Sequence, residues 1–185
     1  MRTFIAIELP QPVQDSLAAL IERLRGSRAR VTWVKPENMH LTLRFLGNME
    51  PDPLDRLRAN LEVALHDTRS FALRVQGLGA FPNARRPSVL WAGVESDDGE
   101  LGRVHAIAER AAQSIGLAPE TKAFHPHLTL ARVKNPAEAA AVMPFWEREQ
   151  GFEGGSFPVN RVILFSSTLT PRGPVHRPIQ EFPFQ

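Results

Sequence analysis

The tetrapeptide His-Leu-Thr-Leu occurs twice in this chain, beginning at His40 and again at His127. For the six histidines of the chain, such a repeat has roughly half a percent chance of arising by coincidence. Histidine titrates near neutral pH, so one imidazole of a pair can accept a proton while the other donates one. Threonine hydroxyls can donate hydrogen bonds to an anion. Two such motifs side by side would suit the cleavage of a phosphodiester, which needs a base, an acid and donors to the phosphate oxygens.

Both motifs are expected to lie on β-strands, where alternate side chains share a face. In each copy the histidine and the threonine then face one way and the two leucines face the core. The same alternation puts Phe45 with the leucines of the first copy and His125 beside the histidine of the second. If the strands are neighbours about a pseudo-two-fold axis, two histidines and two threonines converge on one cleft. Either copy alone could equally be a half-buried strand with a structural histidine, and the repetition argues against that alternative.

A metal site is the weaker interpretation of these histidines. His125 and His127 have the spacing of a metal-binding pair on a strand, and His40 could be a third ligand. Zinc sites usually also recruit carboxylates, and neither histidine strand holds one; Glu37 is the only near candidate. The absence of cysteine excludes thiolate nucleophiles and cysteine-ligated zinc. No nucleophile elbow or glycine-rich phosphate loop is present. The residues therefore favour acid–base chemistry with no metal and no other cofactor.

The composition is that of an ordinary globular protein. The chain has 185 residues, of which 43% are hydrophobic and 23% charged, enough for one substantial domain or two lobes that share a core. The formal net charge is only +2, so the sequence pI of 9.6 reflects the absence of Tyr and Cys rather than a strongly positive surface. The short apolar run at 4–7 is followed by Glu8 and Pro10, which excludes a signal peptide or a membrane span there. We expect a soluble cytoplasmic protein, and nothing demands more than a monomer.

The hydrophobic pattern predicts alternating helices and strands. Helices are expected at 11–27, 51–67, 97–117 and 135–149, the last interrupted or kinked at Pro144. Strands are expected at 3–9, 40–47, 70–81, 86–95, 125–133, 155–170 and 173–184. Short turns between strand pairs favour antiparallel pairing, and each histidine strand precedes a helix. We therefore predict an α+β fold over 1–185: a single domain with two pseudo-two-fold-related antiparallel-sheet lobes, helices on the outside, a central cleft and no linker.

Five stretches of the chain resemble one known family. They are "RTFIAIELP", "VTWVKPENMHLTLRFLG", "RPSVLWAGV", "FHPHLTLARV" and "VILFSSTLTPRGPVH". Paired His-x-Thr motifs in this order resemble the two-histidine phosphoesterase superfamily, and within it the RNA 2′,3′-cyclic phosphodiesterases, also called 2′–5′ RNA ligases. The resemblance implies a hydrolase that opens the 2′,3′-cyclic phosphate end of RNA, or a cyclic nucleotide, to a 2′-phosphomonoester without a metal.

The resemblance also implies a role for each motif residue. His40 matches the histidine that acts as proton donor to the leaving ribose oxygen, and His127 matches the proton acceptor that activates water. Thr42 and Thr129 match the threonines that bind the phosphate. Arg132 stands where the family often carries an arginine near the phosphate.

The nucleoside contacts are less defined than the phosphate contacts. Trp33 and Phe45 could stack on a base, although alternation favours a core position for Phe45. His125 is adjacent to the site by alternation. The family often has an aromatic residue, commonly Tyr, where this chain has His176. Two other functions remain open at the same site: an RNA-end-binding module, and a 2′–5′ RNA ligase that runs the reverse reaction.

Overall fold

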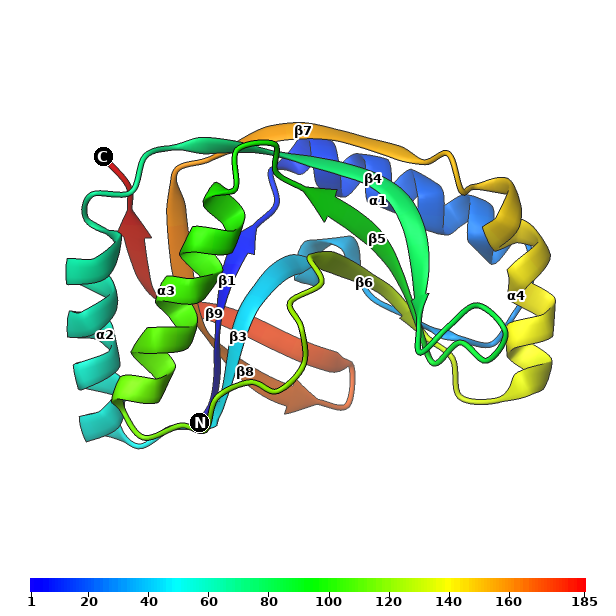
Figure 1. Ribbon diagram of the computed structural model, residues 1–185. Coiled ribbons are helices and arrows are strands. Elements are labelled where there is room, and N and C mark those ends of the chain that lie inside the picture. Colours follow the sequence, from blue (N-terminus) through cyan, green and yellow to red (C-terminus); the bar gives the residue numbers. More distant parts are fainter.

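The computed structural model describes all residues from 1 to 185 and contains two antiparallel sheets flanked by helices (Figure 1). The first sheet has the order β3 (His40–Asn48), β1 (Arg2–Glu8), β8 (Arg161–Thr170), β9 (Gly173–Pro183). The second has the order β2 (Thr32–Trp33), β6 (His127–Arg132), β5 (Val89–Glu95), β4 (Phe71–Phe81), β7 (Glu153–Val159). The prediction of an α+β fold with two antiparallel-sheet lobes is confirmed.

Four α-helices cover the two sheets. Helices α2 (Pro51–Leu65) and α3 (Glu100–Ser114) lie along the first sheet. Helix α1 (Gln11–Arg25) lies along the second sheet, and α4 (Pro136–Arg148) packs against α1 (Figure 1). Proline stands at the start of α1, α2 and α4, where its missing N–H costs no helical hydrogen bond. Helix α4 continues through Pro144. None of these helices combines the length and the apolar character needed to cross a membrane.

The strand orders of the two sheets show the pseudo-two-fold relation. The order β3-β1-β8-β9 in one sheet corresponds to β6-β5-β4-β7 in the other, so each histidine strand occupies the same place. The two-residue strand β2 adds an extra edge beside β6. The related units are interleaved along the chain, because β4 and β5 belong to the second sheet and the chain returns to the first only with β8 and β9. The histidine motifs therefore come from different sheets.

The leucines of both motifs lie in one continuous hydrophobic cluster that includes residues of both lobes. Leu41 and Leu43 of β3 are buried, as are Leu128 and Leu130 of β6. Burying an aliphatic side chain of this size contributes about 1.5–3 kcal/mol. This anchoring of alternate residues holds the intervening histidine and threonine of each strand away from the core.

The predicted strand over 155–170 is wrong, because the chain changes sheets within it. Residues up to Val159 form β7 of the second sheet, and residues from Arg161 form β8 of the first. The junction is Asn160, whose carbonyl oxygen accepts the Phe184 N–H at 2.8 Å. Strand β7 is an edge strand with alternating burial, which tolerates Pro158, whereas β8 is central and begins with a continuous buried run. Pro158 and Asn160 mark this junction in the sequence, but the apolar residues on both sides of it looked like one strand.

Candidate active site

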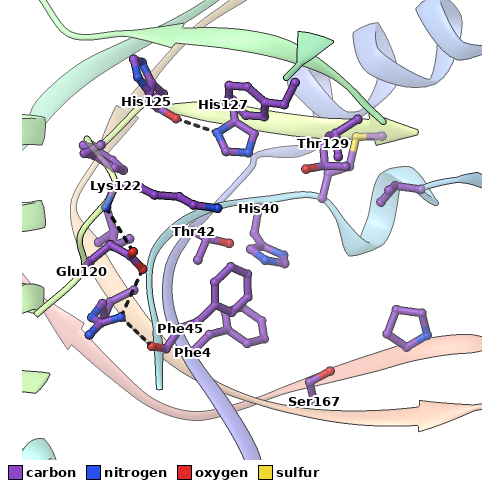
Figure 2. A pocket seen from close by; sticks show the side chains of 18 of the residues that line it. Phe4, His40, Thr42, Phe45, Glu120, Lys122, His125, His127, Thr129 and Ser167 are labelled. Atoms are coloured by element: carbon purple, nitrogen blue, oxygen red, sulfur yellow. Dashed lines mark hydrogen bonds and ion pairs between the residues drawn. The ribbon is translucent and has the colours of Figure 1, made fainter. Parts of the chain in front are cut away.

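A cavity of about 1440 Å³ brings the two motifs together. Strand β3 contributes His40 and Thr42 to its lining, and strand β6 contributes His127 and Thr129. Figure 2 shows the two histidines and the two threonines around one space between the strands. The chain thus converges on a single site from two segments that are far apart in sequence.

Each motif histidine is oriented by the backbone carbonyl two residues before it. The Nδ1–H of His40 donates to the carbonyl oxygen of Asn38 at 2.9 Å, and that of His127 donates to the carbonyl oxygen of His125 at 2.6 Å. Because a carbonyl oxygen only accepts, the hydrogen bond requires the proton on Nδ1 in both rings. Nε2 is therefore the nitrogen of each ring that remains free to exchange a proton with a ligand.

The two threonine hydroxyls are available to a ligand. Thr42 and Thr129 line the cavity, and Figure 2 shows no hydrogen bond from either hydroxyl to the residues around it. A hydroxyl in this position can donate to an anion without first breaking a contact in the protein.

Comparison with known proteins shows the family. The model of the 2′-5′ RNA ligase superfamily matches residues 13–170. The chain belongs to the 2′-5′ RNA ligase superfamily. It is 35% identical over 190 residues to the RNA 2′,3′-cyclic phosphodiesterase of Thermotoga maritima, covering 100% of this chain and 96% of the relative. It is 35% identical over 167 residues to the RNA 2′,3′-cyclic phosphodiesterase of Aeropyrum pernix, covering 89% and 93%.

Solved structures of other proteins have the same fold. A protein of Thermus thermophilus superposes with a TM-score of 0.82 at 29% identity, covering 99% of this chain and 97% of that one. E. coli LigT in its apo form superposes with a TM-score of 0.78 at 21% identity, covering 100% and 97%. These two proteins thus share the bilobal architecture of this chain over almost its whole length.

Arg132, which the superfamily resemblance indicated, reaches the cavity because of a β-bulge. Strict alternation from His127 would place a residue five positions later on the core face. Strand β6 has one extra residue opposite β5, between the paired positions Thr129 and Ala131. Leu130 and Ala131 are consequently both buried, and Arg132 emerges on the cavity side.

The prediction that Phe45 belongs to the core is wrong. Its side chain is 66% exposed and lines the cavity, beside Phe4 (Figure 2). The pairing of β3 with β1 skips Leu43 and Leu46, so β3 carries two extra residues and the alternation is broken. Leu46 is buried in place of Phe45.

The other predicted nucleoside contacts have different positions. Trp33 lies outside the cavity lining: it packs partly buried against the core, with the Arg25 guanidinium 5.8 Å from its ring centre. His125 and His176 both line the cavity. The ring of His176 meets the ring of His40 edge-on, at 5.2 Å between centroids, and so provides an aromatic ring where the superfamily often has Tyr.

Sequence reasoning missed Lys122. This residue lines the cavity, and its ammonium group extends toward the space between His127 and Thr42 (Figure 2). It belongs to the loop between α3 and β6, which is held by Phe124 stacking on His105 at 3.8 Å between ring centroids. Side chains in a loop do not alternate regularly, so the direction of the Lys122 side chain could not be predicted from the sequence. The only available signal was a lysine close before the second motif in a chain with three lysines.

The cavity does not assemble the metal set considered from the sequence. No group of three or more His, Asp or Glu side chains is arranged to hold a metal ion. His40, His125 and His127 therefore line the same cavity without forming a ligand cluster.

His40 is half-buried next to aromatic rings and another histidine. Its ring stacks on Phe4 at 4.5 Å between centroids. Burial and, to a smaller extent, positive charge on the neighbouring His176 together lower the pKa of His40 to about 4, although the hydrogen bond to Asn38 opposes the shift. His40 is therefore neutral in the free protein at neutral pH.

The low pKa of His40 makes the fold acid-sensitive. The unfolded chain binds a proton at His40 below about pH 6.5, whereas the folded protein does so only near pH 4, so the unfolding free energy rises with pH across this window. We expect wild type to lose up to about 3 kcal/mol between these limits. Urea unfolding at several pH values should show a shallower dependence for His40→Asn. The pKa of the His40 ring, measured by NMR titration, should also rise when inorganic phosphate is added. A His40 pKa near 6.5 in the free protein would contradict this account.

Proposed function

We propose that this chain hydrolyses the 2′,3′-cyclic phosphate ends of RNA to 2′-phosphomonoesters, without a metal or another cofactor. The observation that supports this best is the pair of His-x-Thr motifs, each held by the same backbone contact, around one cavity. The relatives in Thermotoga maritima and Aeropyrum pernix are RNA 2′,3′-cyclic phosphodiesterases, and this chain covers almost their whole length. The proposal transfers their reaction to this cavity.

In the proposed reaction the two histidines act on opposite sides of the phosphorus. Nε2 of His127 accepts a proton from water, and the water oxygen forms a bond to phosphorus. The bond from phosphorus to the ribose 3′ oxygen breaks, and Nε2 of His40 donates a proton to that oxygen. The phosphate stays on the 2′ oxygen. Thr42 and Thr129 donate hydrogen bonds to the nonbridging oxygens, and Arg132 balances their charge.

The acid role of His40 depends on the substrate. His40 is neutral in the free protein, yet a general acid must carry a proton. A cyclic phosphate is an anion, and an anion beside an imidazole favours its protonated form. Substrate binding therefore raises the pKa of His40, so that the imidazole is protonated when the leaving oxygen needs a proton.

Phe45, His125 and His176 all line the cavity and are the proposed nucleoside contacts. The exposed ring of Phe45 offers a face for base stacking. Trp33 is not included, because it lies outside the lining. Since both motifs come from one chain, we propose that 1–185 acts as a single domain and as a monomer, on RNA ends in the cytoplasm.

Product analysis tests this function. Adenosine 2′,3′-cyclic phosphate incubated with the protein and excess EDTA should yield adenosine 2′-phosphate as the dominant product, at the same rate as without EDTA. A fixed in-line geometry allows only one oxygen to leave, so phosphorus NMR should show one phosphomonoester.

Other outcomes of the same assay separate the alternatives. A rate that is lost in EDTA and restored by a divalent ion would support a metal enzyme. Tight binding without turnover would support an RNA-end-binding module, and joining of a cyclic-phosphate end to a 5′-hydroxyl RNA in preference to hydrolysis would support the ligase. A dominant 3′-phosphate would keep the histidine pair but reverse the orientation of the substrate.

A further inference from the structure

The two motifs are followed by different residues that line the cavity. Arg132 stands three residues after Thr129, whereas Phe45 stands three residues after Thr42. Both side chains line the cavity, because β3 and β6 each carry irregular pairing just before them. The second motif therefore has a cation beside its threonine, and the first motif has an aromatic ring in the corresponding place.

Lys122 brings a positive charge to the side of the first motif. Its ammonium group points into the cavity toward Thr42 and His127 (Figure 2). The neighbouring carboxylate of Glu120 is not used to neutralise it: Glu120 pairs with Arg44 at 3.5 Å and accepts the backbone N–H of Lys122 at 3.3 Å. An ammonium group without a carboxylate partner in a cavity matches an anionic ligand.

The loop that carries Lys122 is held by an ion-pair network. Arg44 of β3 pairs with Glu109 of α3 at 2.7 Å and donates to the carbonyl oxygen of Ala118 at 2.5 Å. Glu109 in turn accepts the backbone N–H of Glu120 at 2.9 Å. Arg44 lies on the same strand as the first motif but is occupied in fixing the loop. Arg2 also lines the cavity, but Lys122 is the cation whose ammonium group points toward Thr42 (Figure 2).

The charges of the lining leave a net positive site. Glu120 is the only carboxylate among the residues that line the cavity, and it is paired with Arg44. We propose that Lys122 is a second phosphate-binding cation, which contacts a nonbridging oxygen of the cyclic phosphate on the Thr42 side as Arg132 does on the Thr129 side. This inference rests on the proposed function and adds a residue to it. The phosphate is then held between two cations and two hydroxyls that come from both lobes.

Substitution of the lysine tests the contact. Lys122→Met keeps the length of the side chain and removes its charge, and we expect kcat/KM for adenosine 2′,3′-cyclic phosphate to fall by about 100-fold. The Kd for inorganic phosphate should rise by about 10-fold, because a charge-assisted hydrogen bond is lost. Lys122→Arg should recover most of both losses. Lys134→Met is the matched control, since Lys134 is exposed and outside the lining, and it should behave as wild type.

Chemical footprinting of the wild-type protein gives an independent readout. The chain has three lysines, and only Lys122 lines the cavity. Saturating inorganic phosphate should slow acetylation of Lys122 at least several-fold and leave Lys35 and Lys134 unchanged, as measured by peptide mass spectrometry. Unchanged acetylation of Lys122, or a Lys122→Met variant with wild-type phosphate affinity and kcat/KM, would overturn the proposal. An inactive wild-type protein would instead refute the proposed function, while the phosphate measurements would still decide the role of Lys122.

Discussion

His40→Asn and His127→Asn should each lower kcat for cyclic phosphodiester hydrolysis by about 10²–10⁴-fold, the usual cost of removing a general acid or base. The Asn side-chain N–H can replace the Nδ1 donor to the backbone carbonyl two residues before it, but Asn has no titrating group to replace Nε2. The double variant should lose little more than the worse single variant, because both groups act in one step. Steady-state kinetics on adenosine 2′,3′-cyclic phosphate measures all three.

The matched control for the histidine variants is His66→Asn. His66 is exposed after the end of α2 and bonds to Gln185, outside the cavity. This variant should keep wild-type turnover. A folded His40 or His127 variant that retains near-full activity would show that the two-histidine mechanism is wrong.

Gly79→Ala should lower kcat by about 10²-fold because it displaces a side chain that packs near His127. A Cβ atom at Gly79 would lie 2.1 Å from two ring atoms of Trp91 on the paired strand, so the indole must move. The ring centroid of Trp91 lies 6.0 Å from that of His127, and Phe81 meets the same imidazole edge-on at 4.9 Å. A shift of about 1 Å at a reacting group can cost about 10²-fold in rate. Overpacking should also reduce stability by about 1–3 kcal/mol.

Gly102→Ala separates this steric effect from a general intolerance of glycine substitution. Gly102 lies within α3, with no atom within 4 Å of a Cβ placed there. Alanine at this helical position should stabilise the protein by up to about 1 kcal/mol and leave kcat unchanged. Thermal melts and kinetics should be compared for both variants. Wild-type kcat in Gly79→Ala would show that the position of Trp91 does not matter to His127.

The period of the two strands was sufficient to sort the motif residues. Leucines at every second position are buried in both copies, and this alone turns each histidine and threonine toward the other face. The same local pattern predicted the four helices and the antiparallel pairing of neighbouring strands. These features depend on residues a few positions apart, whose preferences are visible along the chain.

The interleaving of the two lobes could not be predicted in this way. Pairing of β1 with β8, or of β4 with β7, depends on which distant apolar faces fit together. The change of sheet takes only one residue, Asn160, between apolar runs on both sides, so one long strand was predicted where two exist. Phe45 was misplaced for a related reason, because the extra residues in β3 are defined only by its partner strand.

The sequence by itself determined which side chains of the two motifs face the proposed site: two histidines and two threonines, with leucines behind them. Only the tertiary structure decided the surroundings of these side chains. The low pKa of His40 arises from burial beside Phe4 and His176, and Lys122 enters the cavity because Arg44 and Glu109 hold its loop. Periodicity depends on a few neighbouring residues of one strand. Burial, local charge and the position of a loop depend on contacts between segments that meet only when the chain has folded.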